Sequence, residues 1–151
     1  MTVQSSTSMP FLNHKLEAKI TGGSFVDMGG SSNKLEVSGF DRVTGKAFTQ
    51  VGTSPVITAG KLDNGEIKLS ILYTETTGDA WKTLYDAYLA GTTAQIQWTP
   101  KGSGVGSFQF TSAVGYLKNV TAPSGESSSG DPIMCEATLV CASYAEAALL
   151  A

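Results

Sequence analysis

One stretch of this sequence, from Thr77 to Gly91, has the periodicity of an α-helix, whereas the chain on either side alternates like strands. Its large apolar residues recur three and four positions apart and therefore share one helical face: Trp81, Leu84, Tyr85, Tyr88 and Leu89. Thr77 or Asp79 suits the N-cap, and Gly91 suits a left-handed C-cap. A helix of about a dozen residues is marginal alone in water. We therefore expect a helix over about 79–90 that buries this face against β-sheet.

Apolar and polar residues alternate on both sides of this helix, which predicts half-buried strands. Leu16, Ala18 and Ile20 share one parity, and Ile67, Leu69, Ile71 and Tyr73 share another. Further strands are expected at 24–28, 34–38, around Ile96 and Trp98, at 107–118 and at 133–143. Short strands with a single helix predict a mainly β fold, an antiparallel β-sandwich or partly closed barrel. The 151 residues fit one domain, 1–151.

The segment from Phe40 to Gly60 does not follow this pattern. Its apolar residues are scattered among glycines and a proline, and the segment exceeds the usual 4–6 residues of a connection. Two interpretations remain open. The segment is either a hairpin packed on its own domain, or a projecting hairpin that becomes ordered against a neighbouring molecule.

The two ends of the chain and one internal loop differ from the strand-rich body. Residues 1–13 are mostly small and polar, which is typical of an extended arm. Residues 122–132 are rich in Ser, Gly and Pro and are expected to form a loop. The Ala- and Leu-rich tail, 144–151, would form either a helical turn or an arm laid on a partner.

The composition limits how much of the surface of the folded molecule can be charged. Charged residues make up 15% of the chain, well below the usual quarter. This shortage has two interpretations: a Ser/Thr-rich surface, or a surface largely covered by copies of the same chain. The net charge of −3 offers no basic footprint for tight nucleic-acid binding. No apolar stretch approaches the ~20 residues that span a bilayer.

The residues that carry most protein chemistry are few and scattered. His14 is the single histidine. A metal site made of several histidines is therefore excluded, and a Ser–His catalytic pair could use only His14. Cys135 and Cys141 lie six apart in one expected strand, roughly 20 Å from each other, too far for a disulfide or a shared zinc. The glycines at 102, 104 and 106 lie between strands and do not open a helix, unlike a phosphate-binding loop. We expect no catalytic residue, no metal and no cofactor.

The order of these elements carries a resemblance. The strand at 67–73 leads into the helix and then into a strand with Ile96-Gln97-Trp98. There follow Phe108 to Tyr116 (FQFTSAVGY), a loop with Pro123-Ser124-Gly125, and Cys135 to Ser143 (CEATLVCAS). Over roughly residues 16–143 the chain resembles the major tail tube protein of long-tailed bacteriophages. The tubes of contractile tails and of type VI secretion are related to that family.

The resemblance implies a β-sandwich assembled as hexameric rings that stack into a hollow tube. The hairpin at 40–60 and the arms at 1–13 and 144–151 would reach neighbouring subunits or rings. The implied contact residues are apolar: Phe40, Val43, Phe48, Val51, Val56 and Ile57. Implied partners are the chain itself, a tape measure protein and a tail terminator. The location would be the virion tail, with assembly in the host cytoplasm. The residues that face the lumen, and the contractile or non-contractile type of tail, stay open.

Elementary physics agrees with such a role. Genomic DNA must pass through the lumen without binding, and a wall that is neutral or negative repels phosphates. Joined subunits would also give the edge strands of each sheet a partner. Two other functions remain as alternatives. A monomeric adhesion or carbohydrate-binding module would expose Trp98 or Tyr116 in a groove, and an enzyme would need a cleft that gathers His14 with carboxylates.

Overall fold

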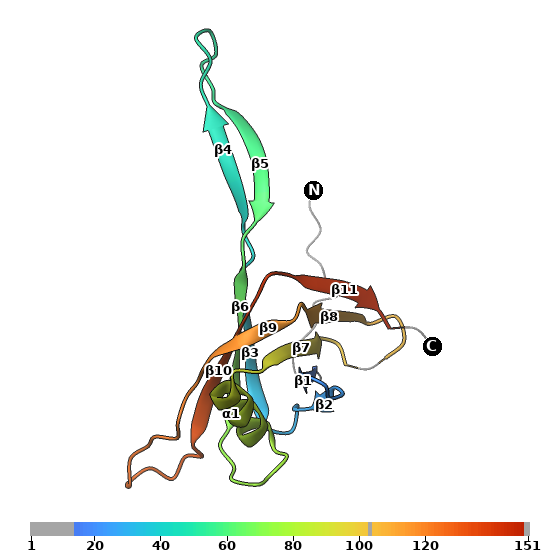
Figure 1. Ribbon diagram of the computed structural model, residues 1–151, viewed down its shortest axis with the longest axis vertical. Helices are drawn as coiled ribbons and strands as arrows, with labels where there is room; N and C mark the ends of the chain where they lie inside the picture. The colour runs from blue at the N-terminus through green and yellow to red at the C-terminus, as the bar shows by residue number, and fades with distance from the viewer. Residues whose placement is uncertain (1–13, 103, 150–151) are drawn as a thin grey trace, which may run out of the picture.

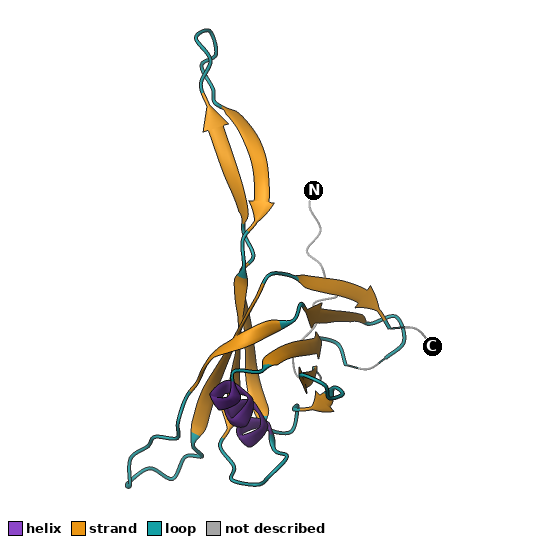
Figure 2. Cartoon of the chain, in the orientation of Figure 1, coloured by secondary structure: helices purple, strands orange, loops and turns teal. Residues whose placement is uncertain are grey.

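The computed structural model describes residues 14–102 and 104–149, and it shows a strand-rich molecule with one helix (Figures 1 and 2). This confirms the predicted mainly β fold with a projecting hairpin, although the sheet does not close into a barrel. The elements, in chain order, are β1 (Lys15–Ile20), β2 (Val26–Asp27), β3 (Ser32–Gly39), β4 (Arg42–Ala47), β5 (Val56–Leu62), β6 (Gly65–Leu72), α1 (Ala80–Ala90), β7 (Thr93–Thr99), β8 (Phe108–Ser112), β9 (Gly115–Val120), β10 (Met134–Cys141) and β11 (Tyr144–Ala148).

Nine of these strands form one antiparallel sheet that bends at β7. The strand order is β11-β8-β7-β9-β10-β6-β3, and β1 pairs with the other side of β7 and with β2. Strands β7, β8 and β11 run across the molecule, whereas β3 and β6 run along its long axis (Figure 1). The bend therefore brings two leaves face to face, and the apolar core lies between them.

The segment 107–118, expected as one strand, is divided at residues 113–114. Its first part, β8, pairs with the C-terminal half of β7, where Gln97 and Trp98 face Thr111 and Phe110. Its second part, β9, pairs with the start of β7 and then with β10. The alternation of apolar residues continues across the break, so the sequence pattern alone does not reveal that the strand changes partner.

The core is built largely from the predicted apolar parities of the strands. The parity predicted for 107–118 is wrong after the break, because Val114 and Tyr116 are 59% and 61% exposed and Leu117 is buried instead. Leu16, Ile67, Ile71, Ile96 and Leu139 are fully buried, at 0% exposure each. These β-branched and leucine side chains alternate with polar ones along their strands, so each strand turns one face inward. Pairing in register, as between β6 and β10, keeps those inward faces together.

Helix α1 packs on β9 and β6 and covers the core at the end of the body opposite the hairpin (Figures 1 and 2). Asp79 is at the N-cap position, but its carboxylate accepts a hydrogen bond from the Thr74 hydroxyl (2.7 Å), and its side chain makes no capping bond. Gly91 ends the helix with φ +64°, as a left-handed C-cap requires. Trp81 stacks on Tyr85 and donates its indole N–H to the Thr121 carbonyl at 3.1 Å.

The predicted inner face of the helix is corrected at one position. Trp81 and Leu84 are buried, and Tyr85 and Tyr88 are partly buried, but Leu89 is 64% exposed. The inward positions are completed by the small residues Ala80 and Ala87. Two alanines allow the helix to lie close to the sheet, and this closer packing rotates Leu89 toward solvent.

The tail does not form a helical turn, and residues 144–148 are a strand that lies on the protein's own sheet. Strand β11 pairs antiparallel with β8 and extends the protein's own sheet, from Tyr144↔Ser112 to Ala148↔Phe108. The ring of Tyr144 packs against Phe40, Trp98 and Phe110. These aromatic contacts hold the start of the strand on the body. The expected arm at 1–13 lies outside the described residues.

Cys135 and Cys141 are unpaired, buried, and both in β10. Burial raises the pKa of both thiols, which keeps them in the unreactive protonated form. In the described part of the chain, no helix has the length and apolar character needed to cross a membrane.

Replacement of Leu84 by Ala tests the assignment of the buried helix face. We expect Leu84→Ala to lower the free energy of unfolding by about 2–5 kcal/mol, because it leaves a cavity in the core. Leu89→Ala is the matched control on the same helix, and its exposed position predicts a change within about 0.5 kcal/mol. Urea unfolding followed by circular dichroism measures both values. Equal losses in the two variants would contradict this assignment.

Candidate assembly surface

The hairpin formed by β4 and β5 projects from the body along its long axis (Figures 1 and 2). The two strands pair with each other, from Arg42↔Leu62 to Ala47↔Val56, and form a sheet separate from the nine-stranded one. Every residue of both strands is exposed to solvent. A two-stranded hairpin on its own is at best marginally stable in water. Within residues 14–102 and 104–149, no second layer packs against the hairpin as it would against a typical sheet.

The hairpin exposes large apolar side chains on its strands and near its tip. Five of the residues proposed from the sequence as contacts are among them: Val43 (59% exposed), Phe48 (67%), Val51 (96%), Val56 (53%) and Ile57 (69%). Leu62, which the sequence analysis did not single out, is 55% exposed at the base of β5. It was missed because the segment was taken to end at Gly60. Clustered exposed apolar side chains typically mark an interaction surface.

Phe40 does not belong to this surface, which corrects one of the proposed contact residues. It is partly buried, packs against the core, and lies edge-on to Tyr144 with the ring centroids 5.0 Å apart. Its φ of +59° follows the +77° of Gly39, so the chain turns sharply where β3 leaves the body. Phe40 therefore anchors the neck of the hairpin to the sheet.

The neck depends on a glycine pair that lets two strands approach closely. Gly39 and Gly65 are partners at the ends of β3 and β6. A Cβ placed on Gly39 would lie 2.8 Å from the Gly65 Cα, and one placed on Gly65 would overlap the Phe40 ring. The absence of side chains at this pair gives Phe40 its seat over Gly65 and sets the direction in which the hairpin leaves the body.

The hairpin is basic and the remainder of the chain is acidic. Of the ten Lys and Arg and thirteen Asp and Glu, residues 42–62 contain Arg42, Lys46 and Lys61 and no acidic residue. This leaves seven basic against thirteen acidic residues elsewhere, a net charge of −6 against +3 on the hairpin. Arg42 donates a hydrogen bond to the Gly60 carbonyl (2.8 Å), which holds its guanidinium across the hairpin.

Besides the two-residue strand β2, two longer strands at the edges of the large sheet have a strand partner on one side only in the described part of the chain. Strand β3 pairs with β6 on one side, and β11 pairs with β8 on one side. Lys34 and Glu36 form an ion pair (2.7 Å) on β3, and charged residues on an edge discourage indiscriminate pairing with other chains. Both edges are nevertheless long enough to accept a strand from a neighbour.

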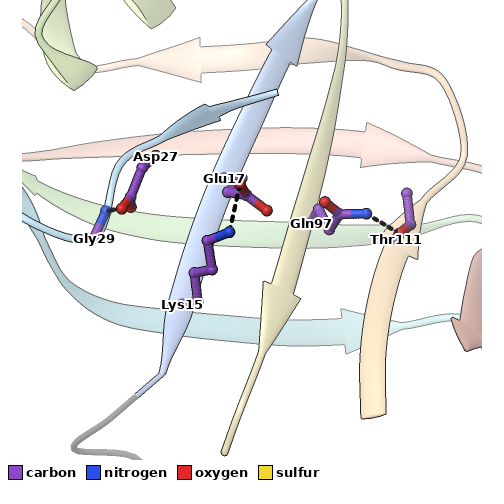
Figure 3. A network of polar contacts seen from close by, with 6 residues as sticks. All are labelled: Lys15, Glu17, Asp27, Gly29, Gln97 and Thr111. Atoms are coloured by element: carbon purple, nitrogen blue, oxygen red, sulfur yellow. Dashed lines mark hydrogen bonds and ion pairs between the residues drawn. The ribbon is translucent and has the colours of Figure 1, made fainter. Parts of the chain in front are cut away.

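A row of polar side chains crosses β2, β1, β7 and β8 on the outer face of their leaf (Figure 3). Neighbouring strands place Asp27 beside Glu17, Glu17 beside Gln97, and Gln97 beside Thr111. Gln97 donates a hydrogen bond to the Thr111 hydroxyl (2.9 Å), and Lys15 forms an ion pair with Glu17 (2.9 Å). This face presents paired polar groups to solvent, in contrast to the apolar hairpin.

The residues proposed for the two alternative functions are not brought together. Trp98 is 5% exposed and stacks on Phe110 inside the fold, so it offers no stacking surface for a sugar. Tyr116 is 61% exposed on β9. Across residues 14–102 and 104–149, no three His, Cys, Asp or Glu side chains gather as a metal ligand set. The surface best suited to binding is therefore the hairpin.

Comparison with solved structures identifies the fold. The chain superimposes on the sheath–tube complex of an extracellular contractile injection system, PVC, with a TM-score of 0.64, 17% identity, and 95% and 93% of the two chains covered. It matches the SPP1 tail tube (TM-score 0.67, 12% identity, 95% and 81% covered). It also matches the tail of an empty GTA particle, determined with C6 symmetry (TM-score 0.62, 14% identity, 97% and 98% covered).

The fold is that of tail tube proteins. The similarity lies in the structure, since no protein-family model and no curated protein matches the sequence. The tail tube fold inferred from the order of the sequence elements is thereby confirmed. The match extends over nearly the whole chain.

The seat of Phe40 on Gly65 can be tested by adding one methyl group. We expect Gly65→Ala to lower the free energy of unfolding by about 1–3 kcal/mol, because the new Cβ overlaps the aromatic ring. Gly30→Ala is the control, since a Cβ there meets no atom within 4 Å. Thermal unfolding of the two variants gives the comparison. A Gly65→Ala protein as stable as Gly30→Ala would show that the neck is not closely packed.

Proposed function

We propose that this protein is the structural subunit of a phage-type tail tube, which assembles as stacked hexameric rings around a channel for DNA. Two kinds of observation support the proposal. The fold matches chains of a contractile-system sheath–tube complex, the SPP1 tail tube and the tail of a GTA particle over nearly the whole chain. The hairpin, moreover, carries apolar residues that one copy of the chain leaves exposed.

The exposed hairpin is the single observation that carries most weight. If the protein acted as a monomer, six large apolar side chains on the strands and loop of a protruding hairpin would remain in water. Full burial of such side chains contributes roughly 1.5–3 kcal/mol each. Burial against another copy of the chain would recover this free energy and would order the hairpin at the same time.

The open strand edges support lateral association into rings. Strand β3 along one leaf and β11 along the other each have a side on which the described chain places no partner. Pairing between copies would satisfy the backbone groups on those sides. Six copies in the ring is the number suggested by the C6 symmetry of the GTA tail.

The charge distribution supports passage of DNA without binding. Most of the basic excess lies on the hairpin, and the rest of the chain has a net charge of −6. On the body, Lys34 and Lys118 are engaged with Glu36 and Glu66 at 2.7 Å each. The hydrogen bond from Lys118 lowers the pKa of Glu66, which keeps this carboxylate ionised. A body with a negative net charge repels phosphates and avoids the counterion release that drives DNA binding.

The proposed role is structural, and its partners follow from it. Each subunit would contact further copies of the chain along and around the axis of the tube. The tube would bind a terminator protein at one end and would hold a tape measure protein inside during assembly. The particle would be a virion tail or a tail-like device, put together in the host cytoplasm. No cofactor takes part.

Deletion of the hairpin separates folding from assembly. We expect replacement of residues 43–61 by Asn-Gly, a turn suited to joining the paired Arg42 and Leu62, to leave the melting temperature within a few degrees of wild type. The shortened protein should form no tubes, because it lacks the apolar strands. Negative-stain microscopy and sedimentation velocity of concentrated protein provide the measurement.

The control for this deletion is Thr53→Ser in the hairpin loop, which keeps the apolar side chains and should assemble like wild type. Tubes formed equally well by the deletion variant would refute an assembly role of the hairpin. If wild-type protein stayed monomeric at all concentrations, also with other tail proteins, the tube proposal itself would be wrong.

A further inference from the structure

Strand β11 covers an edge of the large sheet, although its own side chains contribute little to this pairing. The pairing with β8 runs from Tyr144 to Ala148, and Leu149 continues it by accepting a hydrogen bond from Gly106 N–H and donating one to the Ser107 carbonyl, at 2.9 Å each. All five residues of β11 are exposed, and three of them are alanines. Alanine and glutamate are poor strand formers. After its first residue, the strand is therefore held mainly by backbone hydrogen bonds.

The edge that β11 covers is more apolar than β11 itself. Phe108 lies opposite Ala148, whose single methyl group leaves the Phe108 side chain 55% exposed. Phe110 lies opposite Glu146, which places a carboxylate beside an aromatic residue. Next to both rings is a depression of about 320 Å³, whose lining also includes Pro100. In one copy of the chain, this apolar surface is covered only by small or charged side chains.

This difference decides which strand suits a joint with another copy. A strand added to the outer side of β11 would form backbone hydrogen bonds, but it would cover mainly alanine side chains and one glutamate. A strand added to β8 in place of β11 would form the same kind of bonds and would also cover Phe108 and the depression beside it. Burial of apolar surface is the dominant favourable term in most association. The β8 edge is therefore the better joint.

The other long edge strand, β3, has side chains that match β8. Leu35 and Val37 share one face of β3; Leu35 packs against the core and Val37 is 39% exposed. Phe108 and Phe110 share one face of β8, and Phe110 also packs against the core. Because side chains alternate between the two faces of a strand, β3 placed beside β8 would bring the aliphatic and aromatic side chains together on one face and the polar ones on the other.

We propose that β11 is a releasable strap, which occupies the β8 edge in the free subunit and yields it to β3 of a second copy during assembly. This device rests on the proposed tube function and regulates the step at which a subunit joins. Tyr144 stays in place, because its ring packs against Phe40, Trp98 and Phe110. The strap therefore opens from residue 145 onward, and Tyr144 acts as its fixed end.

Such a strap makes assembly depend on several contacts that form together. Because β11 is tethered to the edge that it covers, its effective concentration there is roughly millimolar, and the strand of a dilute free copy does not displace it alone. A copy that is already held by another contact, such as the hairpin, presents its β3 at a comparable effective concentration. Free subunits therefore remain single until a growing tube end offers both contacts.

A disulfide between the two strands tests whether the strap must open. Gln109 and Ala147 are register partners, and paired antiparallel strands place such Cα atoms about 4.5–5.5 Å apart, within the span of a disulfide. The native Cys135 and Cys141 are buried and do not compete. We expect oxidised Gln109→Cys/Ala147→Cys to form at least tenfold less tube than the same protein after reduction. Sedimentation and negative-stain microscopy measure tube mass, and circular dichroism verifies folding.

The control for the crosslink is Ala147→Cys alone, treated with the same oxidant, which should assemble like wild type. Oxidised double variant that assembles as well as its reduced form would overturn the strap and leave the tube function intact. A wild-type protein that forms no tubes would instead refute the proposed function.

Substitutions that weaken or strengthen the strap give a second test, with effects of opposite sign. Ala145→Pro/Ala147→Pro removes two backbone N–H groups and should lower the critical concentration for tube formation at least threefold, because the strap opens more readily. Ala145→Thr/Ala147→Thr places better strand formers at these exposed positions and should raise it at least threefold. If β11 stayed on β8 in the tube, the proline variant would assemble less readily than wild type. That result, or an unchanged critical concentration in both variants, would contradict the inference.

Discussion

The main constraint on this structure is that the paired strands β4 and β5 project from the body and do not pack against its apolar core. A single sheet layer cannot bury both faces, so the apolar residues of the hairpin are exposed to water in one copy as the structure describes it. The six large side chains offer on the order of 10 kcal/mol if fully buried. Association itself costs roughly 4–15 kcal/mol. One docked hairpin therefore supports only weak binding, and durable assembly needs several contacts made together, as a ring of copies would provide.

The neck between the body and the hairpin, formed by Gly39, Phe40 and Gly65, sets the direction in which the hairpin projects. Gly39 and Gly65 allow the ends of the paired strands β3 and β6 to lie close together. Phe40 packs over this point, against Gly65 and Tyr144. Phe40 adopts a left-handed conformation, which is costly for a residue with a side chain. The cost is offset by aromatic packing at the core boundary. The same packing makes β11 part of the body, because Tyr144 begins that strand.

The charged residues are distributed unevenly along the long axis of the molecule, on which the hairpin and the body lie (Figure 1). Residues 42–62 of the hairpin contain three cations and no acidic residue, although Asp41 and Asp63 flank them, and carboxylates lie on the loops at the opposite end. A molecule with opposite ends of opposite character favours head-to-tail contact over head-to-head contact. The body carries the net negative charge of the molecule.

The sequence alone predicted the features that depend on short-range periodicity. Alternation along β1, β6 and β10, the helical period at 79–90 and the C-cap at Gly91 all reflect local burial patterns, and the structure has each of them. The apolar residues from Val43 to Ile57 were named as contact residues because the family resemblance implied a projecting hairpin at 40–60, and their side chains are exposed in the structure.

Only the tertiary structure decided the features that depend on which strand meets which. Residues 107–118 keep the alternation of apolar and polar residues in the sequence, while their strand partner changes from one half of β7 to the other half and β10. The tail forms a strand because β8 offers an open edge. Phe40 packs inward because Gly65, which has no side chain, lies beneath its ring. The groove lined by Tyr73 and Ile133 joins residues about sixty positions apart. Such contacts leave no local pattern, since periodicity records whether a side chain is buried and not what it is buried against.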